Sequence, residues 1–272
     1  MTGSRRLDGK STFRLTKTKR DTLQLLAEYF CLRTSDIARL IRHRNPNEND
    51  QRSVRHTLGL LHKAGLVNRL PYLDLNRENG SVTYVYGLSD KGLGDLSGKA
   101  LTEHSQRTLD HELEIAYFHI ALKQFCGEQG FPLYWQQKDL KRTVSPDALF
   151  AIRDPKRPEG KDTLYYFLEI ERAKSGNYRD GRSSIIRKLG KYYDYYNSNK
   201  CAKEWGDFRQ FRTIIVQRTE ERRANLLKEL EGTYRHRMFW LTTEALYKQD
   251  ISSRIFQTPR DFREGALYSF RN

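Results

Sequence analysis

The chain has 272 residues, with 49 lysines and arginines against 34 aspartates and glutamates, which gives a formal net charge of +15 at pH 7. Hydrophobic residues make up 37% of the sequence, enough to bury a core, so a chain disordered throughout is excluded. No apolar run approaches the roughly 20 residues that a membrane-spanning helix needs, so we expect a cytoplasmic protein. The positive charge favours a polyanionic partner, usually nucleic acid, with a membrane surface as the competing alternative.

The length suits two domains better than one, because single cores rarely grow beyond about 250 residues. We expect a flexible basic arm at 1–16, a first domain at 17–98 and a second at 99–272, joined near the linker residues 94–98. Three cysteines without CxxC spacing are expected to be small packing residues. They are Cys31, Cys126 and Cys201.

The first domain has the pattern of three helices followed by a hairpin. Apolar residues at helical spacing predict helices at 18–32 and 35–41, and Pro46 then interrupts the helical pattern. Asn49 or Asp50 is expected to cap a third helix, with Val54, Leu58 and Leu61 as its buried row. Strands are predicted at 66–75 and 82–88, joined by turn residues 76–80.

The outward row of the third helix carries side chains that can reach phosphates and base edges in a major groove. The candidate DNA-binding residues are Gln51, Arg52, Arg55, His56 and Lys63, with Arg69 on the strand that follows. A solvated basic helix face is the alternative. The passage KAGLVNRL…VTYVYGLSDKG resembles the strand and Leu-Ser-x-x-Gly exit of winged-helix proteins, with Ser89 capping the next short helix. That resemblance covers residues 17–98 and implies binding to double-stranded DNA.

The second domain alternates helices and strands, which predicts an α/β domain with covered sheet faces. A strong helix is expected over residues 111–125, and the runs VSPDALFAI and TLYYFLEIE are predicted to pair as a hairpin across residues 154–162. The remaining predicted elements are a strand at 133–137, helices at 184–197 and 220–230, and strands at 213–217 and 238–242.

Three acidic residues are expected to share one face of this hairpin. Asp147 lies within the first predicted strand, and Glu169 and Glu171, two residues apart, point to the same side of the second. Carboxylates gathered in this way need a cation, and Mg²⁺ or Mn²⁺ prefers such oxygen ligands, so the cluster predicts a metal site for phosphodiester chemistry. The alternative is a solvated strand end, where the glutamates pair with Arg172, Lys174 or Lys188.

The order of a helix, Pro146-Asp147, Glu169-x-Glu171, a further helix and a strand is similar to the PD-(D/E)xK nuclease fold. More narrowly, the chain resembles the replication-relaxation family of plasmids and integrative mobile elements. The motifs that carry this resemblance are His111-x-Leu113, Pro146-Asp147-Ala148, Phe167 to Arg172, and the run Lys188, Leu189, Tyr192, Tyr195. The resemblance implies an α+β chain: a winged helix-turn-helix, then a PD-(D/E)xK-like α/β domain with a mixed sheet.

One position departs from the nuclease pattern. The pattern places a lysine two residues after the motif glutamate, where this chain has Glu171; Lys188 on the following helix, or Lys174, could supply the missing cation. The run of Tyr192, Tyr193, Tyr195 and Tyr196 also offers candidate nucleophiles, although aromatic residues at helical spacing more often pack against a sheet. His111 and His119 are eight residues apart on one helix, too far to share a metal.

These features favour a DNA-binding protein of a mobile element, acting in plasmid replication, relaxation or mobilisation and able to nick DNA with a divalent cation. The alternative is a transcriptional regulator without enzymatic activity that uses the second domain to form a homodimer or bind a partner. An RNA-binding or membrane-surface protein is a third class.

Overall fold

The structure, a computed structural model, describes residues 14–42, 46–73, 82–94, 96, 99–137, 140, 142–172, 185–198, 200–206, 208 and 210–271. Its backbone contacts divide the chain into two compact units, residues 1–116 and 117–272, and the division falls inside a long helix. The domain boundary expected near residue 98 stays a prediction, and most of the basic arm at 1–16 lies outside the described residues. Among the helices described, none combines the length and apolar composition needed to cross a membrane.

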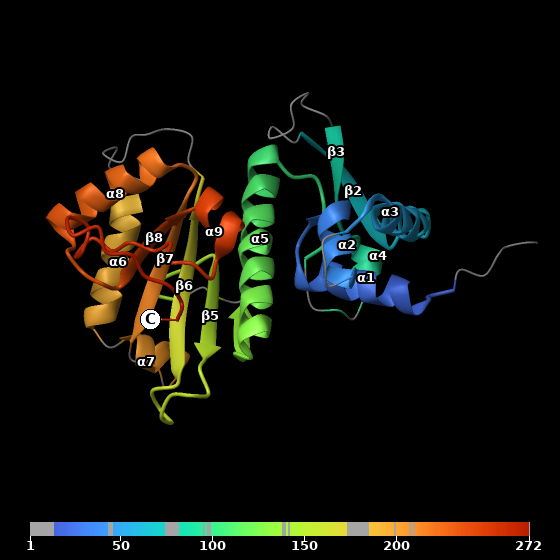
Figure 1. Ribbon diagram of the computed structural model, residues 1–272. Helices are drawn as coiled ribbons and strands as arrows, with labels where there is room; N and C mark the ends of the chain where they lie inside the picture. Colours follow the sequence, from blue (N-terminus) through green and yellow to red (C-terminus); the bar gives the residue numbers. More distant parts are fainter. Residues whose placement is uncertain are drawn as a thin grey trace, which may run out of the picture. The chain divides into compact units, whose positions relative to one another are not determined.

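The first unit contains a group of helices and a small antiparallel sheet (Figure 1). Its elements are α1 (Lys17–Glu28), β1 (Leu32–Arg33), α2 (Thr34–Arg42), α3 (Glu48–Lys63), β2 (Val67–Leu73), β3 (Val82–Leu88), α4 (Asp90–Leu93) and the start of α5 (Gln106–Gln129). The sheet order is β1-β3-β2. This is the order of three helices and a hairpin that the sequence predicts, with β1 as an unpredicted third strand. The turn at 76–80 lies outside the described residues.

The start of α3 corrects one sequence prediction. The cap is Asn47, not Asn49 or Asp50: its side chain accepts from the Asp50 backbone N (2.9 Å), and the Asp50 carboxylate accepts from the Asn47 N (3.0 Å). This reciprocal capping box satisfies donors that the first helical turn leaves without partners, so the helix begins directly after Pro46-Asn47. The predicted buried row of α3 is confirmed as buried.

The Leu-Ser-x-x-Gly exit ties the two ends of the hairpin together. Ser89 caps α4 as predicted, because its Oγ accepts from the Gly92 N (2.9 Å) and donates to the Gly65 carbonyl (2.6 Å). A Cβ at Gly92 would lie only 1.7 Å from the Leu66 carbonyl oxygen, so no side chain fits there. The motif therefore serves the packing of the hairpin base.

The second unit is built on one five-stranded sheet of order β4-β5-β6-β7-β8. Its elements after α5 are β4 (Leu133–Gln136), β5 (Ala148–Arg153), β6 (Thr163–Glu171), α6 (Ile185–Asn197), α7 (Lys200–Trp205), β7 (Phe211–Gln217), α8 (Glu220–Thr233), β8 (Phe239–Thr243) and α9 (Glu244–Asp250). Strands β4 to β6 are antiparallel and β6 to β8 are parallel, so the predicted mixed sheet is confirmed. The sequence analysis missed α7 and α9.

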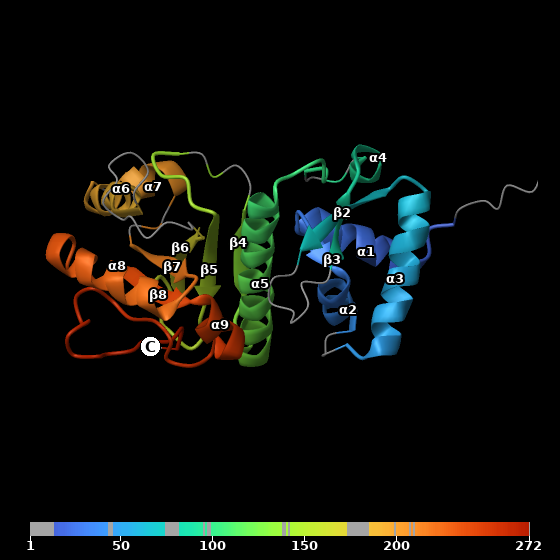
Figure 2. The ribbon, with the colours of Figure 1, turned by 90° about the horizontal axis from the view of Figure 1, so that it is seen from above.

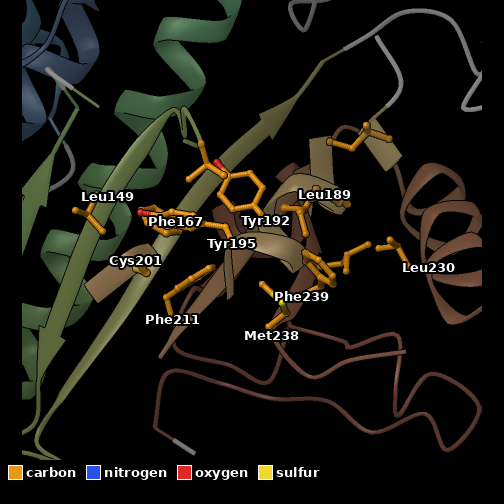
Figure 3. Close-up of a cluster of buried hydrophobic side chains, with 14 of the residues drawn as sticks. Leu149, Phe167, Leu189, Tyr192, Tyr195, Cys201, Phe211, Leu230, Met238 and Phe239 are labelled. Atoms are coloured by element: carbon orange, nitrogen blue, oxygen red, sulfur yellow. The ribbon is translucent and has the colours of Figure 1, made fainter. Parts of the chain in front are cut away.

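Helices cover both faces of this sheet, as Figures 1 and 2 show: α6 and α8 lie on one face, and α9 and the part of α5 from Tyr117 onward lie on the other. On the α6 face, Phe167 of β6 packs among Leu189, Tyr192 and Tyr195 (Figure 3). Because residues two apart on a strand share a face, Glu169 follows Phe167 toward the same helix. The three cysteines are free and buried, as expected.

Candidate functional site

Asp147 is held against the backbone of β6. Its backbone N donates to the Leu168 carbonyl (2.9 Å), and its Oδ2 accepts from the Ile170 N (2.7 Å). The sequence predicted Asp147 within the strand, but β5 begins one residue later, at Ala148. Pro146 has no backbone N–H to donate, so the pairing of the strand does not continue before Asp147. These two bonds place the carboxylate beside Glu169, as the hairpin prediction required.

Glu169 is the buried centre of the site. Its side chain lies on the α6 face of β6, and the residue is only 2% exposed. Oε2 accepts a hydrogen bond and ion pair from the Lys188 ammonium, and Oε1 accepts from the Tyr192 hydroxyl (2.5 Å). The side chain of Lys188 remains 42% exposed, so the ammonium lies where the buried carboxylate meets solvent.

The electrostatics of the site follow from this burial. Burial first, and then the negative charge of Asp147, raise the pKa of Glu169 to about 8, although Lys188 and Tyr192 act in the opposite direction. Burial by itself lowers the pKa of Lys188, but the carboxylates of Glu169 and Asp147 outweigh it, and the net shift is upward. The site therefore holds a buried carboxyl, Glu169, whose charge is disfavoured by burial and by the neighbouring Asp147, and a partly exposed ammonium bound to it.

Glu171 ends β6 on the same face, and its charge also acts on Lys188. In the register of β6 with β7 its neighbour is Gln217. Gln217 is fully buried, and among the residues that the structure describes neither its amide oxygen nor its amide nitrogen has a hydrogen-bond partner. The sequence analysis missed this residue; the available signal was a polar amide directly after the apolar run 214–216 of β7.

Asp147, Glu169 and Lys188 lie close together. The sequence offered Lys188 and Lys174 as alternative sources of the lysine; Lys188 of α6 contacts Glu169, and Lys174 lies outside the described residues. Within the described part of the chain, no group of three or more His, Cys, Asp or Glu is arranged to hold a metal ion. The donor chemistry of Asp147 and Glu169 nonetheless fits a hard divalent cation, which would offset both the burial and the Asp147 charge that raise the pKa of Glu169. Metal binding here stays a prediction.

The tyrosines of α6 serve the core. Tyr192 and Tyr195 are buried, with ring centroids 5.7 and 6.5 Å from that of Phe167. Burial raises the pKa of the Tyr192 hydroxyl well above its usual range, the opposite of what a nucleophile needs. His119 stacks on Trp135 at 4.1 Å, and burial lowers its pKa to about 3, which suits a packing role.

The candidate DNA-binding residues of the first unit lie mainly on its surface. Five are placed along α3: Arg52, Arg55, His56 and Lys63 are exposed and Gln51 is half-buried. Arg69 is exposed on β2 and lies over the ring of Tyr84, 5.1 Å from its centroid. A groove of about 230 Å³ is lined by Gln51 and Arg55 of α3, by the beginning of α2 and by Tyr84 and Tyr86 of β3. The outward row of α3 thus borders a hollow that the hairpin completes.

Comparison with known proteins agrees with the motifs. The replication-relaxation family model matches residues 23–210, more than half of the chain and a span that includes α3, Asp147, Glu169 and Lys188. Among solved structures, restriction endonuclease FokI is similar at 10% identity, covering 93% of this chain and 71% of that chain, with a TM-score of 0.27, a likeness too low to carry an argument. No curated protein matches. On the family match, the chain belongs to the replication-relaxation family.

Proposed function

We propose that this protein binds duplex DNA through the outward row of α3 and cleaves one strand with Asp147, Glu169 and Lys188, using Mg²⁺ or Mn²⁺. The observation that carries the proposal is the ion pair of Lys188 with Glu169 beside Asp147, because it gathers two carboxyl groups and one ammonium at one end of the sheet. The family assignment supports a role in plasmid replication, relaxation or mobilisation.

Each residue has a separate task in this proposal. Asp147 and Glu169 would hold the cation, which when bound would supply polarisation of a phosphoryl oxygen and a lowered pKa of a bound water. Lys188 offsets the negative charge that develops on the phosphate oxygens as water adds to phosphorus and one P–O bond breaks. Tyr192 positions Glu169 through its hydrogen bond to Oε1.

The duplex is held by the first unit. Arginine presents a planar fork that matches phosphate and the O6 and N7 edge of guanine, so Arg52 and Arg55 suit both backbone and base contacts. Both are exposed, and the ion pair of Arg52 with Glu48 is long (3.7 Å) and solvent-exposed, so it costs little to break.

The test is conversion of supercoiled plasmid to its nicked form in Mn²⁺ or Mg²⁺. Wild type should nick, and D147N, E169Q and K188M should each lose activity while still binding duplex DNA. K191M is the matched control, because Lys191 is an exposed lysine on the same helix and should leave activity unchanged. Nicking that survives in K188M and E169Q would show that a contaminant or another site is responsible.

A second function, DNA binding without cleavage, is favoured by one observation: both carboxylate oxygens of Glu169 already accept hydrogen bonds, and the described residues form no three-ligand group. In that case the second unit serves as a platform for a homodimer or a protein partner. Full duplex binding with no nicking, and no rise in melting temperature with Mg²⁺ or Mn²⁺, would select this function.

A further inference from the structure

A pocket of about 710 Å³ opens on the second unit at the end of the sheet face away from Glu169. Aromatic and cationic side chains from β4 to β6 and from the α7 region line it. Those that matter here are Tyr134, Tyr165, Trp205, Phe208, Arg142 and Arg153. Its volume lies within the usual range of pockets for small ligands.

The aromatic side chains of the pocket are arranged as flat surfaces. Tyr165 and Phe208 stack with centroids 4.0 Å apart and planes 10° from parallel. The guanidinium of Arg142 lies over the Trp205 ring, 5.2 Å from its centroid. Tyr134 is 54% exposed, the most exposed of the large hydrophobic side chains described. An exposed tyrosine beside stacked rings and a guanidinium offers a planar ligand a surface on which to stack.

Charge in the pocket favours an anion with a polar, planar group. Arg142 and Arg153 bring two guanidinium groups to the lining, and Arg153 also forms an ion pair with Asp162 (2.5 Å), which is not part of the lining. Among the described residues of the lining, Glu204 is the one carboxylate, and it accepts from the Thr143 N (3.2 Å), the Thr143 hydroxyl (2.5 Å) and the Tyr195 hydroxyl (2.9 Å). Its charge is thereby spread over three donors and opposes a phosphate less than a bare carboxylate would.

This pocket is separate from the Asp147 and Glu169 site. Tyr165 and Glu169 share a face of β6 but are four residues apart, roughly 13 Å along the strand. Between them Phe167 is fully buried and packs against Tyr195 and Trp205. The two sites therefore open at different ends of one sheet face.

We propose that this pocket binds an unpaired nucleotide of single-stranded DNA. A base stacks on Tyr134 and the neighbouring rings, and its phosphates face Arg142 and Arg153, the combination that single-strand binding surfaces use. Duplex DNA does not fit the same contacts, because its bases stack on each other and show only their edges. The inference goes beyond the proposed function and does not require cleavage.

Fluorescence anisotropy with a labelled thymidine oligonucleotide, and with a duplex of equal length, tests the proposal on the full chain. The Y134A/R142A variant should lose about tenfold or more in affinity for the single strand and keep its duplex affinity. L267A/R260A is the matched control, since both residues are exposed on the same unit outside the pocket, and it should bind both DNAs as wild type does.

A second readout places the base in the pocket. Saturating single-stranded DNA should quench tryptophan emission in wild type, and W205F should lose most of that quenching while keeping its melting temperature. Equal single-strand affinity of Y134A/R142A and wild type, or quenching that persists in W205F, would overturn the proposal. Tighter binding of the matching RNA oligonucleotide would contradict the assignment to DNA.

Discussion

Lys188 of α6 forms an ion pair with Glu169 of β6, although the two residues are 19 positions apart in the sequence. The nuclease pattern that the chain resembles has its lysine two residues after the glutamate, where this chain has Glu171. The strand itself does not supply an ammonium next to this carboxylate. The helix that packs on the strand supplies it instead. The predictions below test this arrangement and its consequences.

Duplex affinity should depend on the outward row of α3. R52A/R55A removes two guanidinium groups from the exposed face and should weaken duplex binding at least about tenfold, since each good arginine contact is worth about 1 to 3 kcal/mol. K228A/R260A is the matched control, because it removes the same charge from exposed positions of the second unit. Equal affinities of the two double variants in an anisotropy titration would mean that α3 does not carry the DNA contact.

Stability should fall as pH rises from about 5 to about 8, because of Glu169. The folded state keeps this carboxyl protonated up to a pKa of about 8, so below that pH Lys188 donates to a neutral acid and the full ion pair forms as the proton leaves, whereas the unfolded chain releases the proton near its ordinary value of 4.5. Between these values the folded state binds more protons, so each rise in pH favours unfolding, by at most about 1.4 kcal/mol per unit for one proton.

E169Q should remove this slope, and D147N should move the end of the window to lower pH, because it deletes the second cause of the raised pKa. Urea unfolding across the range measures both effects. A slope that is the same in E169Q and wild type would show that Glu169 titrates normally.

Gln217 should be replaceable with a gain in stability. Its buried amide has no partner among the described residues, and an unsatisfied buried polar group costs about 1 to 3 kcal/mol, so Q217M should raise the free energy of unfolding by about 1 kcal/mol. Gln257 provides the contrast: it is buried, but its Oε1 accepts from Arg223 (2.8 Å), so Q257M should destabilise. A loss of stability in Q217M comparable to that in Q257M would contradict the assignment. If Q217M gains stability but loses nicking activity, the Gln217 amide takes part in the reaction.

The sequence was enough to predict those elements whose signals are local. Apolar periodicity predicted the helices and the two hairpin strands of the first unit, although the cap of α3 was placed too late, and the alternation along TLYYFLEIE predicted the shared face of Glu169 and Glu171. The position of Lys188 could be offered only as one of two alternatives, because it depends on how α6 packs across the sheet. Gln217 and the Tyr192 contact with Glu169 depend on the pairing of β6 with β7 and on that same packing. A local pattern marks Gln217 as a polar strand end, but none shows that it is buried or that Tyr192 reaches Glu169.

The most direct test moves the lysine back to the position that the nuclease pattern gives it. K188M should abolish nicking of supercoiled plasmid in Mn²⁺, and E171K in the K188M background should restore a measurable part of it, because Glu171 lies on the same face of β6 as Glu169 and its charge already acts on Lys188. E171K with K191M, which keeps Lys188, controls for the added charge. Restored nicking in E171K/K188M, lost again when E169Q is added, is the result that this account predicts. Nicking by K188M at the wild-type level would contradict this account. So would the absence of nicking in wild type itself, if wild type still binds duplex DNA.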